Sequence, residues 1–306
     1  MDDNFFHSPQ FFDICQHTPR HRPYLAVLSD DDGEVMAQLL AVVRYRTSWF
    51  PPYYYMHCRI MGEGVYRAKA QGALFGLMLQ TVTSHLGRRM LYVEVSHLSH
   101  KMMGYRELRD NGYFPVRWMS IHNSLHSRRP EERVASSLLQ RIATAYQRGV
   151  VTDEVADDED FRTFMRLLRH HNWLKPKRYI PADELFRQIL QQPENGRLFL
   201  TRYRRHVIGC SAVVYSQQQA YLWFAAYRRK TYAMFHPREL TIWHAIKDAH
   251  RRGYEHIFFM DVGLPFRRNK FREFILRFGG KPVSTYRWFR FSIRWLNALL
   301  SWFYRD

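Results

Sequence analysis

The run Met90-Leu-Tyr-Val-Glu94-Val95 has a second version later in the chain, Ile257-Phe-Phe-Met-Asp261-Val262. Both runs are short, apolar and β-prone, and both carry a carboxylate in fifth place. A glycine follows each carboxylate 18 positions later, Gly112 in the first copy and Gly279 in the second. Each run also comes just after a helical pattern that ends in a glycine. These coinciding features indicate an internal duplication, so we expect two copies of one structural unit.

The segments around the two runs predict a similar order of elements. In the first copy we expect a hairpin over 23–28 and 35–45, a strand or loop over 49–55, a helix over 65–86, and a closing strand within 104–125. In the second we expect a helix over 131–148, an acidic stretch over 153–160 that leads into a helix ending at about 171, and a helix over 182–192. Strands over 197–203, 206–215 and 220–227 and a helix over 237–252 follow. The predicted fold is therefore α/β, with a mixed, mostly antiparallel sheet flanked by helices in each domain. The predicted bounds are 1–127, 128–290, and an amphipathic C-terminal helix over 291–306.

Composition excludes several classes of protein. The 306 residues are 46% hydrophobic and 24% charged, which is typical of a globular protein. The three cysteines, Cys15, Cys58 and Cys210, lie far apart and predict a reducing compartment rather than a disulfide framework. The first residues are acidic, and no apolar stretch approaches the ~18 residues of a membrane span. We therefore expect a cytoplasmic protein.

The charge is uneven along the chain. The formal net charge is +18, and residues 126–306 hold 33 basic and 17 acidic residues against 13 and 11 in residues 1–125. A basic field of this size attracts polyanions such as RNA, nucleotide phosphates or acidic lipid headgroups. The alternative is a generally basic surface that serves solubility.

Three segments of the second half carry a family resemblance. Pro237 to Gly253, the run Met260-Asp261-Val262-Gly263, and Phe274-Ile-Leu-Arg-Phe-Gly279 resemble the Fem family of peptidyltransferases, and 134–165 is also similar. The resemblance covers most of 130–290 and, more loosely, 5–125. It implies two GNAT-type acyltransferase domains and transfer of amino acids to a peptidoglycan precursor. It also implies an aminoacyl-tRNA or acyl-CoA donor, no tightly bound cofactor, and a phosphorylated or lipid-linked cell-envelope acceptor.

The sequence departs from the family at two motifs. Asp261-Val262-Gly263-Leu264 stands where the family usually has Asp-Phe-Gly-Gly. Ile275 stands where the resemblance would place a lysine on the substrate phosphate. Arg272, Arg277 or Lys281 could supply that charge instead, and the peptidoglycan substrate stays open.

Acyl transfer to an amine needs a base, an oxyanion donor and aligned substrates. Backbone N–H groups on a splayed strand can supply the oxyanion donor, so no nucleophile motif is required. Asp261, at a predicted strand end, is our candidate to orient or deprotonate the amine; the alternative is that it caps the following turn. We expect its counterpart Glu94 to be structural.

Two segments are candidates for the donor side. Gly62-Glu63-Gly64 precedes a predicted helix and weakly matches a phosphate loop. The corresponding turn in the second half, 233–238, contains no glycine, which disfavours acetyl-CoA there and favours an aminoacyl-tRNA. Five residues that flank this turn are candidates to bind a phosphate or a terminal adenosine: Tyr227, Arg228, Arg229, Lys230 and His236. The alternative is that they form a solvated basic loop.

Two basic clusters are candidates for the acceptor side or for plain surface. Arg267, Arg268, Lys270 and Arg272 follow Asp261 and suit a diphosphate. Lys175, Lys177 and Arg178 stand near the position of a substrate arginine in the family. The histidine pairs His97/His100 and His122/His126 have ligand-like spacing without a third ligand, so we expect no metal site.

The last segment is strongly amphipathic. On a helical wheel from Ser292, the apolar residues Ile293, Leu296, Leu299, Leu300, Trp302, Phe303 and Tyr304 share one face with Trp295 at its edge. We expect this helix either to dock on the anionic inner membrane surface or a lipid-linked substrate, or to pack on the first domain. Buried tryptophans would indicate packing, and exposed ones docking.

The sequence as a whole favours an acyltransferase that moves an acyl or aminoacyl group to an amine of a cell-envelope or polysaccharide precursor. The alternatives are a CoA-dependent N-acetyltransferase in exopolysaccharide synthesis and a non-catalytic nucleic-acid-binding protein. Possible partners are tRNA and an anionic membrane.

Overall fold

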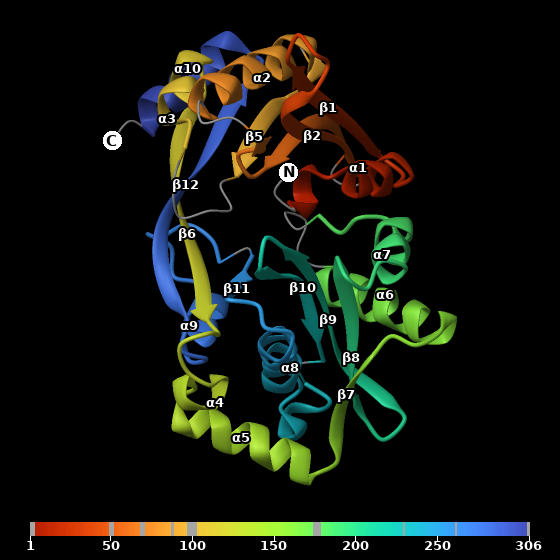
Figure 1. Ribbon diagram of the computed structural model, residues 1–306. Helices are drawn as coiled ribbons and strands as arrows, with labels where there is room; N and C mark the ends of the chain where they lie inside the picture. Colours follow the sequence, from red (N-terminus) through yellow and green to blue (C-terminus); the bar gives the residue numbers. More distant parts are fainter. Residues whose placement is uncertain are drawn as a thin grey trace. The chain divides into compact units, whose positions relative to one another are not determined.

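The computed structural model describes residues 4–48, 52–67, 71–86, 89–96, 103–173, 179–228, 230–260 and 262–304 (Figure 1). The chain forms two compact units. Unit 1 consists of residues 1–118 and 284–306, and unit 2 consists of residues 119–283. The chain leaves unit 1 within strand β6 (Phe114–Ser124) and returns to it within β12 (Lys281–Phe291).

Unit 1 is a mixed sheet with helices packed on it. The strand order is β1 (His21–Ser29), β2 (Val35–Ser48), β3 (Tyr53–Met61), β5 (Tyr92–Ser96), β12, and the short β4 (Val65–Tyr66) pairs with β2. All neighbours are antiparallel except β3 and β5. The helical elements are η1 (Phe5–His7), α1 (Pro9–Gln16), α2 (Gln71–Leu86), α3 (Tyr105–Asp110) and α10 (Arg294–Phe303). Phe75, Met78 and Leu79 of α2 are fully buried in a core that also contains β-strand residues such as Leu39 and Trp288.

Unit 2 has the same mixed character. Its strand order is β6, β11 (His256–Phe259), β10 (Gln219–Tyr227), β9 (His206–Ser216), β8 (Gly196–Tyr203), β7 (Val150–Glu154), and only β10 and β11 are parallel. Its helical elements are α4 (Pro130–Arg133), α5 (Ser136–Gln147), α6 (Asp158–Asn172), α7 (Asp183–Leu190), η3 (Ala233–Phe235), α8 (Pro237–Arg251) and α9 (Lys270–Leu276). The apolar side chains of α5 and α8 share one core with Phe199 and Ala225 of the sheet. Phe224, the neighbour of Ala225, contacts Phe186 of α7, so α7 covers the opposite face.

The order of elements confirms the predicted duplication. In each copy three antiparallel strands are followed by a helix, a strand parallel to the third, a short helix and a last strand. Gly112 and Gly279 both have positive φ, 77° and 82°, and both come shortly after the short helices α3 and α9. β5, which carries Glu94, and β11, which leads to Asp261, therefore hold equivalent places.

The last strands are exchanged between the copies. β6 of the first copy pairs with β11, and β12 of the second copy pairs with β5. The predicted bounds 1–127 and 128–290 thus follow the sequence copies. The compact units follow the exchanged pairing, which sequence periodicity alone does not reveal.

Three elements differ from the sequence prediction. The helix expected over 131–148 is interrupted, because Val134 is extended and the N–H of Ala135 donates to the carbonyl of Arg277 at 2.9 Å. The acidic stretch at 153 begins inside a strand, β7, which pairs with β8. In the predicted helix over 65–86, Val65 and Tyr66 form β4, and α2 begins at Gln71.

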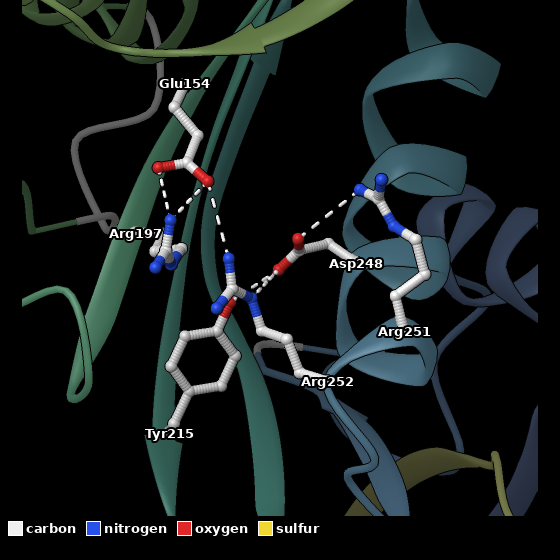
Figure 2. A network of polar contacts seen from close by, with 6 residues as sticks. All are labelled: Glu154, Arg197, Tyr215, Asp248, Arg251 and Arg252. Atoms are coloured by element: carbon white, nitrogen blue, oxygen red, sulfur yellow. Dashed lines mark hydrogen bonds and ion pairs between the residues drawn. The ribbon is translucent and has the colours of Figure 1, made fainter.

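A buried carboxylate anchors the C-terminal end of α8 (Figure 2). Asp248 is 4% exposed and accepts hydrogen bonds from the Tyr215 hydroxyl and from Nε of Arg252, both at 2.8 Å. Nη2 of Arg252 also lies 3.4 Å from Glu154 of β7, which is paired with Arg197 of β8. Burial, followed by the charge of Asp248, raises the pKa of Tyr215. The network ties α8 to β7, β8 and β9, and so fixes the direction in which its N-terminus points.

Candidate functional site

The parallel strand pair of unit 2 opens partway along its length. β10 and β11 are in register from Gln219↔His256 to Leu222↔Phe259. β10 then continues to Tyr227 without β11, and its pairing with β9 shifts register between Leu222 and Phe224. A bulge at this point bends the strand away from its parallel neighbour. Residues 223–227 of β10 extend past the described end of β11 and form what we call the open strand end of unit 2; their side chains are buried.

The equivalent strand pair of unit 1 is closed. β5 pairs with the far end of β3, from His57↔Tyr92 to Met61↔Ser96. The Gly62 N–H donates to the Ser96 carbonyl at 2.8 Å and extends the pairing by one more residue. Within the described residues, the two copies therefore differ in which part of the third strand is paired, and β10 but not β3 extends past its parallel neighbour.

The glycine loop of unit 1 is filled by its own chain. His7 of η1 is fully buried, and its Nε2 lies 3.2 Å from the Gly64 nitrogen, while the Leu40 N–H donates to Nδ1 at 2.9 Å. Burial lowers the pKa of His7 to about 4, so the ring is neutral at pH 7. A Cβ on Gly64 would lie 2.9 Å from the Gln38 carbonyl oxygen, so this glycine serves close packing. The loop 62–64 does not offer the open N–H cradle that a phosphate needs.

Glu94 is held in an ion-pair cluster. Its carboxylate lies 3.1 Å from Nη1 of Arg287 and 3.7 Å from Nε of Arg59, and it accepts a hydrogen bond from Ser96 at 2.9 Å. Burial opposes ionisation of Glu94, but Arg59 and Arg287 outweigh it and hold the pKa at about 2. Arg287 in turn lies over the Trp118 ring at 3.9 Å. A carboxylate with this pKa is a poor proton acceptor, which agrees with a structural role.

At the C-terminal end of β10, two side chains from other elements lie next to Tyr227. Nδ1 of His171, from α6, lies 2.9 Å from the Tyr227 carbonyl oxygen and 3.3 Å from its nitrogen. Arg238, from α8, lies 5.7 Å from the Tyr227 ring centroid and 3.5 Å over the ring of Phe274. Its Nη2 also donates to the Lys270 carbonyl at 3.3 Å. Sequence analysis singled out Tyr227 but neither His171 nor Arg238, because their proximity arises only from the packing of α6, α8 and α9.

Two backbone N–H groups of the turn before α8 are bonded within the turn. The Phe235 and His236 N–H groups donate to the carbonyls of Tyr232 and Ala233 at 3.0 and 3.2 Å. His236 adopts left-handed φ and ψ of 47°, and Pro237 has no N–H to offer. The absence of a glycine noted in the sequence is thus matched by a turn whose Phe235 and His236 N–H groups are already bonded, whereas the start of α8 has no side-chain cap.

Side-chain hydrogen bonds from Asn269 and Arg272 fix the turn between Val262 and α9. Nδ2 of Asn269 donates to the Val262 carbonyl at 2.9 Å, while its Oδ1 caps α9. Arg272 donates to the carbonyls of Leu264, Pro265 and Arg267 at 2.8, 3.3 and 2.7 Å. Arg272 therefore holds this turn in place, a role that its position in a basic cluster did not reveal.

The remaining predicted cations are dispersed around this turn. Arg267, Lys270 and Lys281 are exposed, whereas Arg268 is paired with Glu273 at 3.1 Å. Arg277 donates to Ser137 at 3.1 Å, and Arg228 donates to the Val207 carbonyl at 3.1 Å. Ile275, at the position of the family lysine, is 0% exposed in the core of unit 2. Position 275 therefore cannot present a charge to solvent without leaving the core.

Several candidates lie outside the described residues: Asp261, Lys175, Lys177, Arg178, Arg229, His97 and His100. His122 is described and is buried against His256, with ring centroids 5.2 Å apart. Within the described parts of the chain, no group of three or more metal-binding side chains is present. The same parts contain no helix that is both long and apolar enough to cross a membrane.

Comparison with known proteins agrees with this geometry. Residues 132–268 match the acetyltransferase (GNAT) domain family. The whole chain is similar in structure to FemX (TM-score 0.69, 11% identity, 98% of this chain and 95% of that one). It is also similar to L-PGS from Bacillus licheniformis (TM-score 0.61, 10% identity, 100% and 99%). A tandem GNAT protein from the clavulanic acid biosynthesis pathway matches with a TM-score of 0.52, 10% identity, and 90% and 84% coverage.

No curated protein sequence matches the chain significantly. The chain has the fold of Fem-type, GNAT-like acyltransferases, in two copies, and unit 2 contains the segment that matches the GNAT family.

Proposed function

We propose that the protein transfers an acyl group, preferably an aminoacyl group, from an ester donor to an amine, and that unit 2 alone is catalytic. The observation that carries this proposal is the difference between the two parallel strand pairs. Unit 2 opens after Leu222 and Phe259, whereas unit 1 is paired to the end of β3. An extended acyl donor can lie along an open strand end but not along a closed one.

The reaction joins the amine nitrogen to the carbonyl carbon of the donor. The amine first loses a proton to Asp261, which follows Phe259 by two positions in the sequence. The nitrogen then adds to the carbonyl carbon, and the C–O bond of the ester (the C–S bond of a thioester) breaks. The leaving hydroxyl or thiol takes up a proton, so the products are an amide and the free carrier.

A backbone N–H of β10 is the proposed oxyanion donor. The Arg228 N–H donates to the Ile208 carbonyl on β9, while the Tyr227 N–H points to His171 instead. Since N–H groups alternate along a strand, the Ala225 N–H lies on the same side as that of Tyr227, along the open strand end. Such a fixed donor stabilises the charge that develops on the carbonyl oxygen.

The turn before α8 favours aminoacyl-tRNA over acyl-CoA as the donor. With the Phe235 and His236 N–H groups bonded and Pro237 lacking one, the turn itself adds few donors for a pyrophosphate to the helix start. Three arginines of α6, Arg162, Arg166 and Arg169, line a hollow of about 610 Å³ beside Trp173, which is 80% exposed. Asp183 also lines it and is paired with Arg169, and Arg162 lies 3.8 Å from Asp158. Cations beside an exposed indole suit a nucleic-acid backbone and a stacked base.

The acceptor is proposed to be an amine of a phosphorylated or lipid-linked cell-envelope precursor. The exposed cations Arg267 and Lys270 follow the proposed base directly along the chain. They suit a diphosphate better than a neutral acceptor.

A donor assay tests this proposal. The purified protein is incubated with lipid extract from bacterial membranes and either tRNA charged with labelled amino acids or labelled acetyl-CoA. We expect label in an amide product from the tRNA arm, identified by mass spectrometry. Transfer from acetyl-CoA alone would replace the preferred donor with the GNAT alternative. No transfer from either donor would contradict the proposal.

A further inference from the structure

Helix α10 presents its apolar side chains to solvent. Trp295, Trp302 and Phe303 are 68%, 69% and 70% exposed, and no residue of the helix is buried. The polar Asn297 instead faces unit 1: it accepts from the Phe291 N–H at 2.8 Å and donates to the Gly112 carbonyl at 3.1 Å. An amphipathic surface helix normally packs its apolar face on the core, so α10 has the opposite orientation. Of the two outcomes predicted from the sequence, the exposed tryptophans favour docking.

A basic pocket lies beneath this helix, within unit 1. It has a volume of about 620 Å³ and lies between α10, the end of β12 and the segment after α3. Arg109, Arg290 and Arg294 line it, and none of the described residues in its lining is an aspartate or glutamate. The nearby Asp110 is paired with Arg106 at 3.6 Å. The described residues that line the pocket therefore carry a net positive charge.

Hydrogen-bond donors complete the lining. Ser84, Asn111 and Ser301 add hydroxyl and amide groups to the three guanidinium groups. Arginine forks bind phosphate oxygens in pairs, and neutral donors of this kind fill the remaining oxygen positions.

A second hollow adjoins the start of α10. It has a volume of about 650 Å³, and its lining joins Tyr54, Met90 and Ile293 with Arg89 and Arg294. Tyr54 and Ile293 are themselves 66% and 43% exposed. Exposed apolar side chains are therefore present next to the helix as well, on the neighbouring strand and loop.

We propose that α10 and the arginine pocket beneath it dock unit 1 on an anionic phospholipid surface, with the phosphate of one lipid headgroup in the pocket. Tryptophan and phenylalanine are favoured at the boundary between headgroups and acyl chains, where an interfacial helix buries its apolar face. The arginines supply the electrostatic part of the attraction, which is needed because a short apolar face alone binds membranes weakly. Every residue involved lies in unit 1, so docking does not depend on acyl transfer in unit 2.

Vesicle flotation of the full-length protein tests this proposal. The vesicles contain phosphatidylcholine alone or with added phosphatidylglycerol. We expect the wild-type protein to float with the anionic vesicles and to bind them at least about tenfold more tightly than the neutral ones. Trp302→Ser with Phe303→Ser is expected to weaken binding by about tenfold or more. Arg290→Gln with Arg294→Gln is expected to do the same on anionic vesicles only.

Matched variants on unit 2 serve as controls. Trp173→Ser removes an equally exposed indole, and Arg128→Gln with Arg129→Gln removes the same charge from exposed positions. Both controls are expected to float like the wild type, and thermal melts check that all variants are folded. The proposal is overturned if the α10 variant floats like the wild type or if a control loses as much binding. It is also overturned if light scattering shows a dimer that the α10 variant breaks, without vesicle binding.

Discussion

At the scale of single residues, the two copies treat the same carboxylate position differently. Glu94 lies between Arg59 and Arg287, and its pKa of about 2 keeps the carboxylate ionised at neutral pH. Asp261 follows an open strand end instead, and the turn after it is fixed by Asn269. Both copies therefore keep a carboxylate at this position, and in unit 1 that carboxylate forms structural ion pairs.

Replacing Asp261 by asparagine tests its proposed role as the base. We expect Asp261→Asn to lower turnover by at least about tenfold, because an amide cannot accept the amine proton. The melting temperature should stay nearly unchanged, since the substitution keeps the shape of the side chain. Steady-state kinetics and a thermal melt on the same preparation decide the matter. Unchanged turnover, or loss of folding, would assign Asp261 to the turn instead.

The low pKa of Glu94 predicts an acid-sensitive contribution to stability. Because the pKa falls from 4.5 to about 2 on folding, the carboxylate stabilises the fold above about pH 4.5, and this stabilisation is lost as the pH falls toward 2. The difference corresponds to about 3 kcal/mol. Urea unfolding of the wild type and Glu94→Gln between pH 7 and 3 should therefore show the largest gap at neutral pH. A gap that does not narrow in acid would contradict this account.

At the scale of elements, the register of one strand separates an open copy from a closed one. β5 pairs with the end of β3, and β11 pairs with the beginning of β10. The sequence predicted both strands and the equivalent places of Gly112 and Gly279, because these depend on local periodicity and backbone conformation. It could not predict the register shift or the exchange of β6 and β12, which depend on contacts between distant segments. For the same reason, Arg238 and His171 escaped notice, whereas Tyr227 did not.

The anchor of α8 is expected to carry much of the stability of unit 2. Asp248→Ala removes a buried carboxylate and leaves the Tyr215 hydroxyl and Nε of Arg252 without their acceptor. We expect a loss of about 3 kcal/mol or more in the free energy of unfolding. Arg251→Gln is the matched control, because Arg251 is 62% exposed and lies 3.4 Å from the same carboxylate. It should cost less than about 1 kcal/mol. Equal losses would show that the network is not the anchor described above.

At the scale of the whole molecule, the two units divide the work. Unit 1 fills its own glycine loop with His7, pairs its Glu94 and exposes α10, while unit 2 holds the open strand end and the segment matched by the GNAT family. Residues 126–306 also hold 33 of the 46 lysines and arginines. The proposed functions thus combine a catalytic copy that has a basic surface with a copy whose own sites are structural or face a lipid.

The basic half predicts salt-sensitive binding of polyanions. Affinity for RNA should fall at least about tenfold between roughly 50 and 200 mM salt, because binding releases counterions from the phosphates. Fluorescence anisotropy with a labelled RNA measures this directly. Equal affinity at both salt concentrations would exclude the electrostatic interpretation.

The central claim, that the donor binds the open copy, is tested most directly by hydrogen exchange. The protein is measured with and without a non-hydrolysable aminoacyl-tRNA analogue, and peptides from both third strands are compared. We predict protection of residues 223–227 in β10 and of the turn at 233–236, with no change at 57–61 in β3. Protection confined to β3 and the loop at 62–64 would place the donor in unit 1 and contradict the account.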